Sequence, residues 1–145
     1  MSDRTHDIVL LGVTGFTGRQ VAAWFAEHVP RTDVRWALAA RSPGRLAAVR
    51  DGLGPGFADV PLLIVDTLDA EGVGEMAAST RVVLTTVGPY ARFGDLVVDA
   101  CVEHGTDYVD ITGETPWVRR VIARHHERAA AEGTRIVPFC GFDSV

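Results

Sequence analysis

Apolar and polar residues are arranged along the chain in two kinds of segment that alternate. Short, nearly continuous apolar runs, typical of strands buried on both faces of a sheet, occupy residues 7–11, 34–40, 62–65, 81–87, 108–111 and 135–137. Between these runs the apolar residues recur at helical spacing. Because continuous apolar strands joined by crossover helices form parallel sheets, the pattern predicts an α/β domain of about six parallel strands with helices on both faces.

Two of the predicted helices have a clear apolar stripe. The first, which ends near His28, has a buried side formed by Val21, Ala22, Trp24 and Phe25. The last, which ends at Gly133, has a stripe formed by Val118, Val121, Ile122, His125 and Ala129. We expect these stripes to pack against the sheet.

Capping residues define where the other helices begin. Ser42 is a good N-cap and Pro43 a good first helical residue, which predicts a second helix to about residue 51. Asp66 or Thr67 is expected to cap the third helix, and the fourth is expected to span residues 94–104. The last residues, 139–145, have no element of their own.

A glycine-rich turn follows the first apolar run directly. Gly12, Gly15 and Gly18 are three residues apart, between a predicted strand and a predicted helix. In this context the first glycine allows a tight turn, the second lets main-chain amides approach a pyrophosphate, and the third lets the helix lie against the strand. The helix N-terminus adds donors and partial positive charge. The turn therefore predicts a dinucleotide site in a Rossmann-type, doubly wound sheet of order 3-2-1-4-5-6, the alternative being a turn with a structural role alone.

The residues after the second strand indicate which dinucleotide is bound. A carboxylate at this position would accept a hydrogen bond from the ribose 2′-hydroxyl and favour NAD. The chain instead has Arg41 and Ser42, with Arg45 one helical turn further on. An arginine fork and a serine hydroxyl suit a 2′-phosphate, so the sequence predicts NADP(H). The alternative is that Arg41 is a solvated surface charge.

Two further strand ends are expected to complete the cofactor site. Asp66 follows the third strand and could accept a hydrogen bond from the adenine amine, or could simply cap a helix. The segment 87–90 follows the fourth strand and is expected beneath the nicotinamide half, with Tyr90 either contacting the ring or packing on the next helix. The full set of predicted cofactor contacts is Gly12, Val13, Thr14, Gly15, Phe16, Thr17, Gly18, Arg41, Ser42, Asp66, Val87, Gly88, Pro89 and Tyr90.

Composition excludes several other kinds of chemistry. The chain has 145 residues and a net charge of −5, so no basic face for nucleic acid is indicated. It contains no lysine, which rules out a lysine-based P-loop, a Schiff base and a Tyr-x-x-x-Lys catalytic pair. No apolar run approaches the ~18 residues of a transmembrane helix. Cys101 and Cys140 fit reduced thiols of a cytoplasmic protein, and the adjacent His125 and His126 cannot share a helix face, so no metal site is expected.

Several motifs together resemble the saccharopine dehydrogenase-like oxidoreductases over essentially the whole chain. They are Gly12-Val-Thr-Gly-Phe-Thr-Gly18, Ala40-Arg-Ser42, Val87-Gly-Pro-Tyr90 with Gly94, Ala100-Cys101, Tyr108-Val-Asp-Ile-Thr-Gly-Glu114 and Gly141-Phe-Asp-Ser144. The first and last look most similar to the trans-acting enoyl reductase branch. The resemblance implies an NADPH-dependent reductase of polyketide-type lipid synthesis. An amino-acid-type saccharopine reductase and a non-catalytic NADP sensor remain alternatives.

The resemblance also implies a longer protein. Members of the family are two to three times longer and carry a substrate and dimerisation domain after the Gly-Phe-Asp-Ser segment. We therefore expect residues 1–138 to form the cofactor domain and 139–145 to begin the connection. The missing domain would supply the small-molecule or lipid substrate site and a possible homodimer contact, and the fragment alone should reduce little or nothing.

No catalytic residue can be assigned from the sequence. The candidates near strand ends are Tyr90, Asp110, Glu114 and Asp143. Asp110 and Glu114 are four residues apart, which suggests paired acid–base work, but Glu114 is better interpreted as a cap for the helix that follows it.

Overall fold

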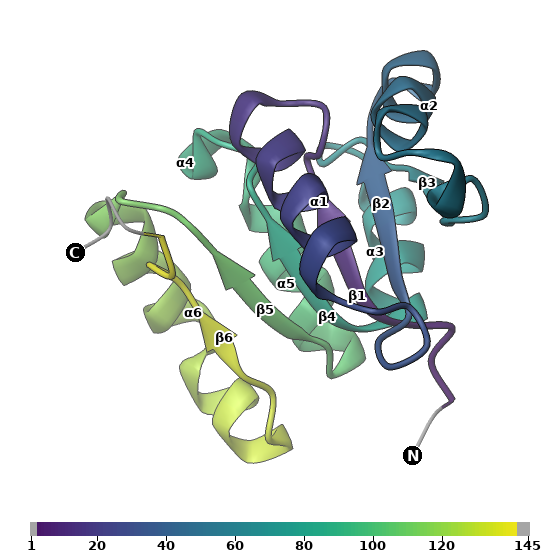
Figure 1. Ribbon diagram of the computed structural model, residues 1–145. Coiled ribbons are helices and arrows are strands. Elements are labelled where there is room, and N and C mark those ends of the chain that lie inside the picture. Colours follow the sequence, from purple (N-terminus) through teal and green to yellow (C-terminus); the bar gives the residue numbers. More distant parts are fainter. Residues whose placement is uncertain (1–2, 142–145) are drawn as a thin grey trace.

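The computed structural model describes residues 3–141 and contains one parallel sheet in that range (Figure 1). Its six strands lie in the order β3-β2-β1-β4-β5-β6, and each neighbouring pair is parallel. The strands are β1 (His6–Leu11), β2 (Trp36–Ala40), β3 (Leu62–Ile64), β4 (Thr80–Thr85), β5 (Asp107–Asp110) and β6 (Ile136–Val137). The predicted strand order is confirmed.

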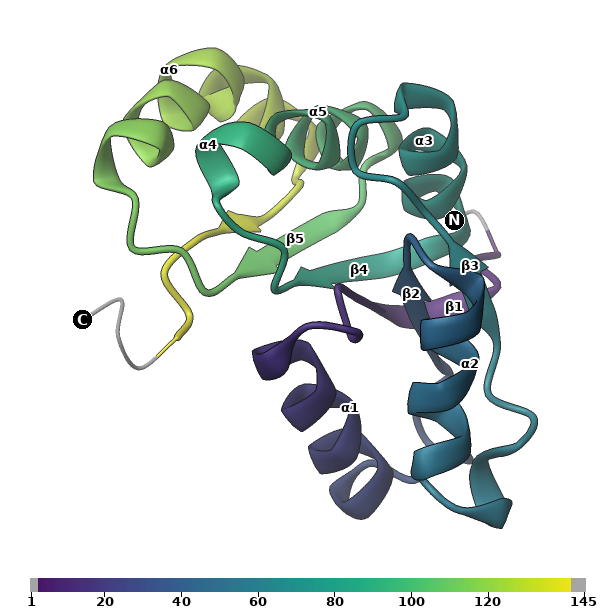
Figure 2. The same cartoon turned by 90° about the horizontal axis from the view of Figure 1, so that it is seen from above.

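Helices cover both faces of the sheet, as Figure 2 shows. One face carries α1 (Phe16–His28) and α2 (Pro43–Gly52), which is followed by a short 3₁₀ turn, η1 (Pro55–Phe57). The other carries α3 (Ala70–Ser79), α4 (Tyr90–Phe93), α5 (Asp95–His104) and α6 (Thr115–Glu132). Two layers of helix around one sheet make the doubly wound α/β arrangement.

The sheet places alternate residues of each strand in opposite hydrophobic clusters. Val9 and Leu11 of β1 belong to the cluster beneath α3, α5 and α6, whereas Leu10 belongs to the cluster beneath α1 and α2. Side chains of successive strand residues point to opposite faces of the sheet, which gives two clusters. Both clusters are buried because helices cover both faces. This explains why the strands appear in the sequence as continuous apolar runs.

Two residues that were predicted to be buried are exposed. Trp24 has 53% of its surface exposed and stacks on His28, with ring centroids 4.7 Å apart. The buried side of α1 is formed instead by Gly18, Ala22 and Phe25. Ile122 is 54% exposed. Both residues lie one position away from a buried residue, and one helical position turns a side chain by about 100°.

One predicted helix start needs correction. Helix α3 begins at Ala70 and is capped by Asp69, whose side chain accepts a hydrogen bond from the Glu71 amide at 3.2 Å. Asp66 and Thr67 therefore do not cap α3. Helix α5 matches the helix predicted at 94–104, and the short α4 before it was not predicted. By contrast, Ser42 caps α2 as predicted.

Candidate functional site

Two glycines of the first turn are required by the fold itself. Gly12 has φ +94°, and a Cβ there would lie 2.7 Å from Cγ2 of Val87. A Cβ on Gly18 would overlap the carbonyl oxygen of Gly12. The turn is therefore pressed against both the end of β4 and the start of α1, as expected for close strand–helix packing.

Gly15 is different, because the protein around it leaves room for a side chain. It has φ −79°, and its Cβ would be at an ordinary 3.5 Å from the Gly12 carbonyl oxygen. Gly15 directly precedes α1. Among the described residues, no side chain caps the first turn of α1, and that turn contains no acidic residue. The free amides and positive end of α1 therefore face outward beside an exposed glycine, which suits a diphosphate.

The turn lies where the strand order of the sheet reverses. β1 pairs with β2 on one side and with β4 on the other, so the crevice between the ends of β1 and β4 is the switch point. Thr86 links the end of β4 to the end of β1. Its amide donates to the Leu11 carbonyl at 3.0 Å and its hydroxyl to the Gly12 carbonyl at 3.3 Å. Ligands of doubly wound sheets bind outside the carboxyl ends of strands at such a point.

A pocket of about 220 Å³ at this edge brings together residues from five separate segments. Its lining includes five predicted contacts, namely Gly12, Thr14, Arg41, Asp66 and Val87. Leu11, Ala40, Val65, Thr67 and Phe93 complete it. Val65 and Thr67 could have been found as neighbours of Asp66. Phe93 gave no sequence signal, because it comes from α4 on the other side of the switch point.

Two arginines lie near the glycine turn, one directly after β2 and one in the first turn of α2. Arg41 is exposed and lines the pocket just described. The Arg45 guanidinium donates to the Thr14 carbonyl at 3.4 Å. A second hollow of about 390 Å³ between α1 and α2 is lined by Thr14, Arg19 and Arg45, so Thr14 borders both. This end of the site is positively charged, as a 2′-phosphate requires.

Three of the predicted contacts differ in which of their atoms are accessible to a ligand. The Val13 side chain is 1% exposed and belongs to the core, so only its main chain can face a ligand. Phe16 is 76% exposed at the first position of α1. Asp66 is exposed, and one of its oxygens accepts a hydrogen bond from the Leu68 amide at 2.9 Å.

On the β4 side of the crevice, Gly88 and Pro89 are exposed but Tyr90 is not. Tyr90 is 5% exposed, donates its hydroxyl to the Thr85 carbonyl at 2.9 Å and packs against the ring of Trp117. Burial raises the pKa of the Tyr90 phenol. Tyr90 is thus an aromatic residue at the start of α4 that packs on Trp117 of α6, and its hydroxyl is bonded to the main chain of β4.

Asp110 is a buried structural carboxylate. It accepts hydrogen bonds from the Tyr108 hydroxyl at 2.6 Å, the Thr112 amide at 3.0 Å and the Phe139 amide at 3.1 Å. Burial raises the pKa of Asp110, although these hydrogen bonds act in the opposite direction. The group links the end of β5 to the segment after β6 rather than facing the crevice.

Glu114 caps a helix, but not the helix that was predicted. Its two carboxylate oxygens accept from the amides of Tyr90 at 2.6 Å and Ala91 at 3.1 Å, and it makes no side-chain cap on α6. The sequence could not reveal this, because the capped helix precedes Glu114 by 24 residues. Asp143 lies outside the described residues.

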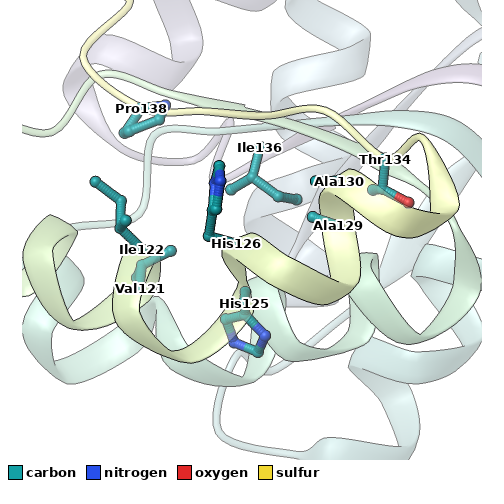
Figure 3. Close-up of a pocket in the computed structure, with 9 residues that line it drawn as sticks. All are labelled: Val121, Ile122, His125, His126, Ala129, Ala130, Thr134, Ile136 and Pro138. Atoms are coloured by element: carbon teal, nitrogen blue, oxygen red, sulfur yellow. The ribbon is translucent and has the colours of Figure 1, made fainter.

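A separate hollow of about 210 Å³ lies between α6 and β6, away from every predicted contact (Figure 3). His126 points into it, whereas His125 points to the other side of the helix and lies 2.8 Å from a carboxylate oxygen of Asp99. Within residues 3–141, no three His, Cys, Asp or Glu residues are grouped to hold a metal ion. None of the helices in that range is long and apolar enough to cross a membrane.

Comparison with known proteins shows the family of the chain. The model of the saccharopine dehydrogenase NADP binding domain family matches residues 8–137. A trans-acting enoyl reductase of Mycobacterium ulcerans is 48% identical over 144 residues, and one of Mycobacterium leprae is 49% identical over 142 residues. These matches cover 99% and 98% of this chain and 34% of each relative, so the chain spans about a third of their length.

Solved structures support the fold. Apo saccharopine dehydrogenase (L-Glu forming) from Saccharomyces cerevisiae superposes with a TM-score of 0.76 at 22% identity, covering 96% of this chain and 28% of the enzyme. The Citrobacter triphenylmethane reductase complexed with NADP(H) gives a TM-score of 0.64 at 17% identity, covering 91% and 48%. These structures show the fold, and the family match over residues 8–137 shows the family. The chain belongs to the saccharopine dehydrogenase NADP-binding domain family, and its cofactor is NADP(H).

Proposed function

We propose that this chain is the cofactor domain of a longer NADPH-dependent enoyl reductase, which reduces a carbon–carbon double bond in a lipid or polyketide intermediate. The observation that carries the proposal is the 48% identity, over 99% of the chain, to a protein named trans-acting enoyl reductase. The matched region includes the segments on both sides of the crevice. The reaction chemistry is supplied by the cofactor, and the protein binds and orients it.

Each part of the crevice has a proposed role. The main-chain amides of the turn 12–18 bind the diphosphate, and Arg41 with Ser42 binds the 2′-phosphate. Asp66 accepts a hydrogen bond from the adenine amine through its second oxygen. The exposed main chain at Gly88 and Pro89 lies beneath the nicotinamide half.

The remaining parts of the proposal concern the longer protein. Residues 1–138 form the cofactor domain and 139–145 begin a connection to a domain that binds the substrate and forms a homodimer in the cytoplasm. The relatives support this division, because about two-thirds of their length lies outside the match. Since the substrate site is assigned to the other domain, the 145-residue chain binds NADPH without turning it over.

The test compares the 145-residue chain with the full-length gene product. We expect both to bind NADPH, and only the full-length protein to oxidise NADPH when a 2-enoyl thioester is added, as measured by loss of absorbance of the reduced nicotinamide. NADP⁺ reduction with saccharopine would instead indicate an amino-acid reductase. Binding without turnover across both substrate classes would indicate a sensor.

A further inference from the structure

We propose that Glu114 is a positioning residue for the nicotinamide half of NADP(H). It touches no cofactor atom itself and acts by holding the loop that follows β4. The inference rests on the proposed function in one respect, because it takes the exposed main chain at Gly88 and Pro89 as the floor of the nicotinamide subsite.

The Glu114 carboxylate is fully committed to the start of α4. One oxygen accepts from the Tyr90 amide at 2.6 Å and the other from the Ala91 amide at 3.1 Å. These are the first two amides of a helix of four residues, which directly follows Gly88 and Pro89. Helix α4 is a single turn, closed by the Phe93 amide donating to the Pro89 carbonyl at 3.0 Å and the Gly94 amide to the Tyr90 carbonyl at 2.7 Å. Because a single turn is marginal by itself, its position depends on outside contacts.

The segment that carries Glu114 is itself held firmly. The Glu114 amide donates to the Thr112 hydroxyl at 3.0 Å, and its carbonyl accepts from the Val118 amide at 3.1 Å in the first turn of α6. Trp117 is 1% exposed and donates its ring N–H to Asp95 at 2.8 Å. The start of α6 therefore holds the start of α4 through Glu114 and the start of α5, which follows α4, through Trp117.

Movement of α4 would change the shape of the cofactor crevice. Val87 precedes α4 in the chain and Phe93 is the last residue of α4. Both residues line the pocket at the switch point. Gly88 lies between Val87 and Pro89, and the nearest atom to a Cβ there would be in the Tyr90 ring, at 3.5 Å. Gly88 and Pro89 are exposed, and the carboxylate of Glu114 holds the helix that directly follows them.

The experiment separates the two halves of the cofactor. Isothermal titration calorimetry on the 145-residue chain measures the dissociation constants of NADPH and of adenosine 2′,5′-bisphosphate, which lacks the nicotinamide half. Glu114→Gln removes the charge and places an NH₂ group against one of the two main-chain amides, so that two donors face each other. Glu114→Asp keeps the charge on a shorter side chain. Glu103→Gln, on the exposed face of α5, is the matched control.

We expect Glu114→Gln to raise the dissociation constant of NADPH about tenfold and to leave that of the bisphosphate within about twofold. Glu114→Asp should have a smaller effect in the same direction, and Glu103→Gln none. An equal loss for both ligands would overturn the inference, because it would reveal a general structural role. So would wild-type affinity for NADPH in Glu114→Gln.

Two results with the wild-type protein distinguish this inference from the proposed function. Equal affinity for NADPH and the bisphosphate would show that this domain gains nothing from the nicotinamide half, which overturns the role of Glu114 and leaves the adenosine site standing. Failure to bind either ligand would overturn both.

Discussion

Gly12, Gly15 and Gly18 are evenly spaced in the sequence, but they differ in whether the fold leaves room for a side chain. Gly12 has a positive φ, and Gly18 has no room for a Cβ, so both serve the packing of α1 on β1. Gly15 has neither constraint. We propose that its lack of a side chain serves the approach of a ligand, which would separate a folding role from a binding role within one motif.

Alanine at Gly15 should therefore leave the fold intact and weaken NADPH binding by about tenfold or more, because a methyl group would hold the diphosphate away from the amides. Alanine at Gly18 should destabilise the protein by about 3 kcal/mol, because the Cβ overlaps main-chain atoms. Urea unfolding and calorimetric titration measure the two effects. Gly44→Ala, where a Cβ meets nothing within 4 Å, is the control. Loss of stability in Gly15→Ala would contradict the separation of roles.

Arg41 is expected to set the preference for NADPH over NADH. Its exposed guanidinium lines the pocket at the end of β2, where a 2′-phosphate would accept charge-assisted hydrogen bonds worth about 1.5–3 kcal/mol. Arg41→Ala should weaken NADPH binding about tenfold or more and leave NADH binding nearly unchanged. Parallel titrations with the two dinucleotides measure this. Equal affinity of the wild type for both would remove the argument.

At the scale of elements, the strands were easier to predict than the helix starts. Three polar residues, Asp66, Thr67 and Asp69, precede α3, and each is a possible cap by residue type. The choice depends on where the chain turns after β3. Asp66 is used in that turn by bonding the Leu68 amide, and Asp69 is left to cap the helix.

Asp69→Ala should therefore lower the free energy of unfolding by about 1 kcal/mol and leave NADPH affinity unchanged. Glu75→Ala, an exposed position within the same helix, should change stability by less than about 0.5 kcal/mol. Urea denaturation followed by circular dichroism gives both values. Equal effects in the two variants would show that Asp69 has no special capping role.

His6, at the start of β1, gives the stability a pH dependence. Burial and then the charge of Arg35 lower the pKa of His6 below 6.5, although Asp7 acts in the opposite direction. Below pH 6.5 the unfolded chain therefore binds more protons at His6 than the folded protein does, so stability falls as the pH falls. The slope from this group is at most about 1.4 kcal/mol per pH unit.

Urea unfolding of the wild type between pH 7.5 and 5.5 should show this loss, and His6→Gln should reduce it. The two pH values bracket the ordinary pKa of histidine, so the difference between the variants isolates the contribution of His6. A wild-type loss that persists fully in His6→Gln would assign the effect to other groups.

At the scale of the whole molecule, the sheet order places the site. Because β1 lies between β2 and β4, the glycine turn, Arg41 and the loop after β4 all meet at one edge, though they are far apart in the sequence. A ligand that spans this edge contacts segments on both faces of the sheet. Its binding should therefore stabilise the entire domain.

NADPH at one hundred times its dissociation constant should raise the free energy of unfolding by about 2.7 kcal/mol. Thermal unfolding with and without NADPH measures the shift. The same NADPH concentration should have a much smaller effect on Gly15→Ala, which keeps the fold and lacks the tight site. A shift of equal size in both proteins would point to binding elsewhere.

The sequence by itself determined the layered α/β fold, the strand order and the dinucleotide turn. These follow from local causes: continuous apolar runs require burial on both faces, and Gly12 and Gly18 allow a turn and a close strand–helix contact that other residues oppose. Tertiary structure alone decided which side chains remain for a ligand. Glu114 bonds amides 24 residues earlier, Phe93 reaches the pocket from the opposite side of the switch point, and Tyr90 turns its hydroxyl inward. Each depends on contacts between segments distant in sequence, and no local pattern of residues records such contacts.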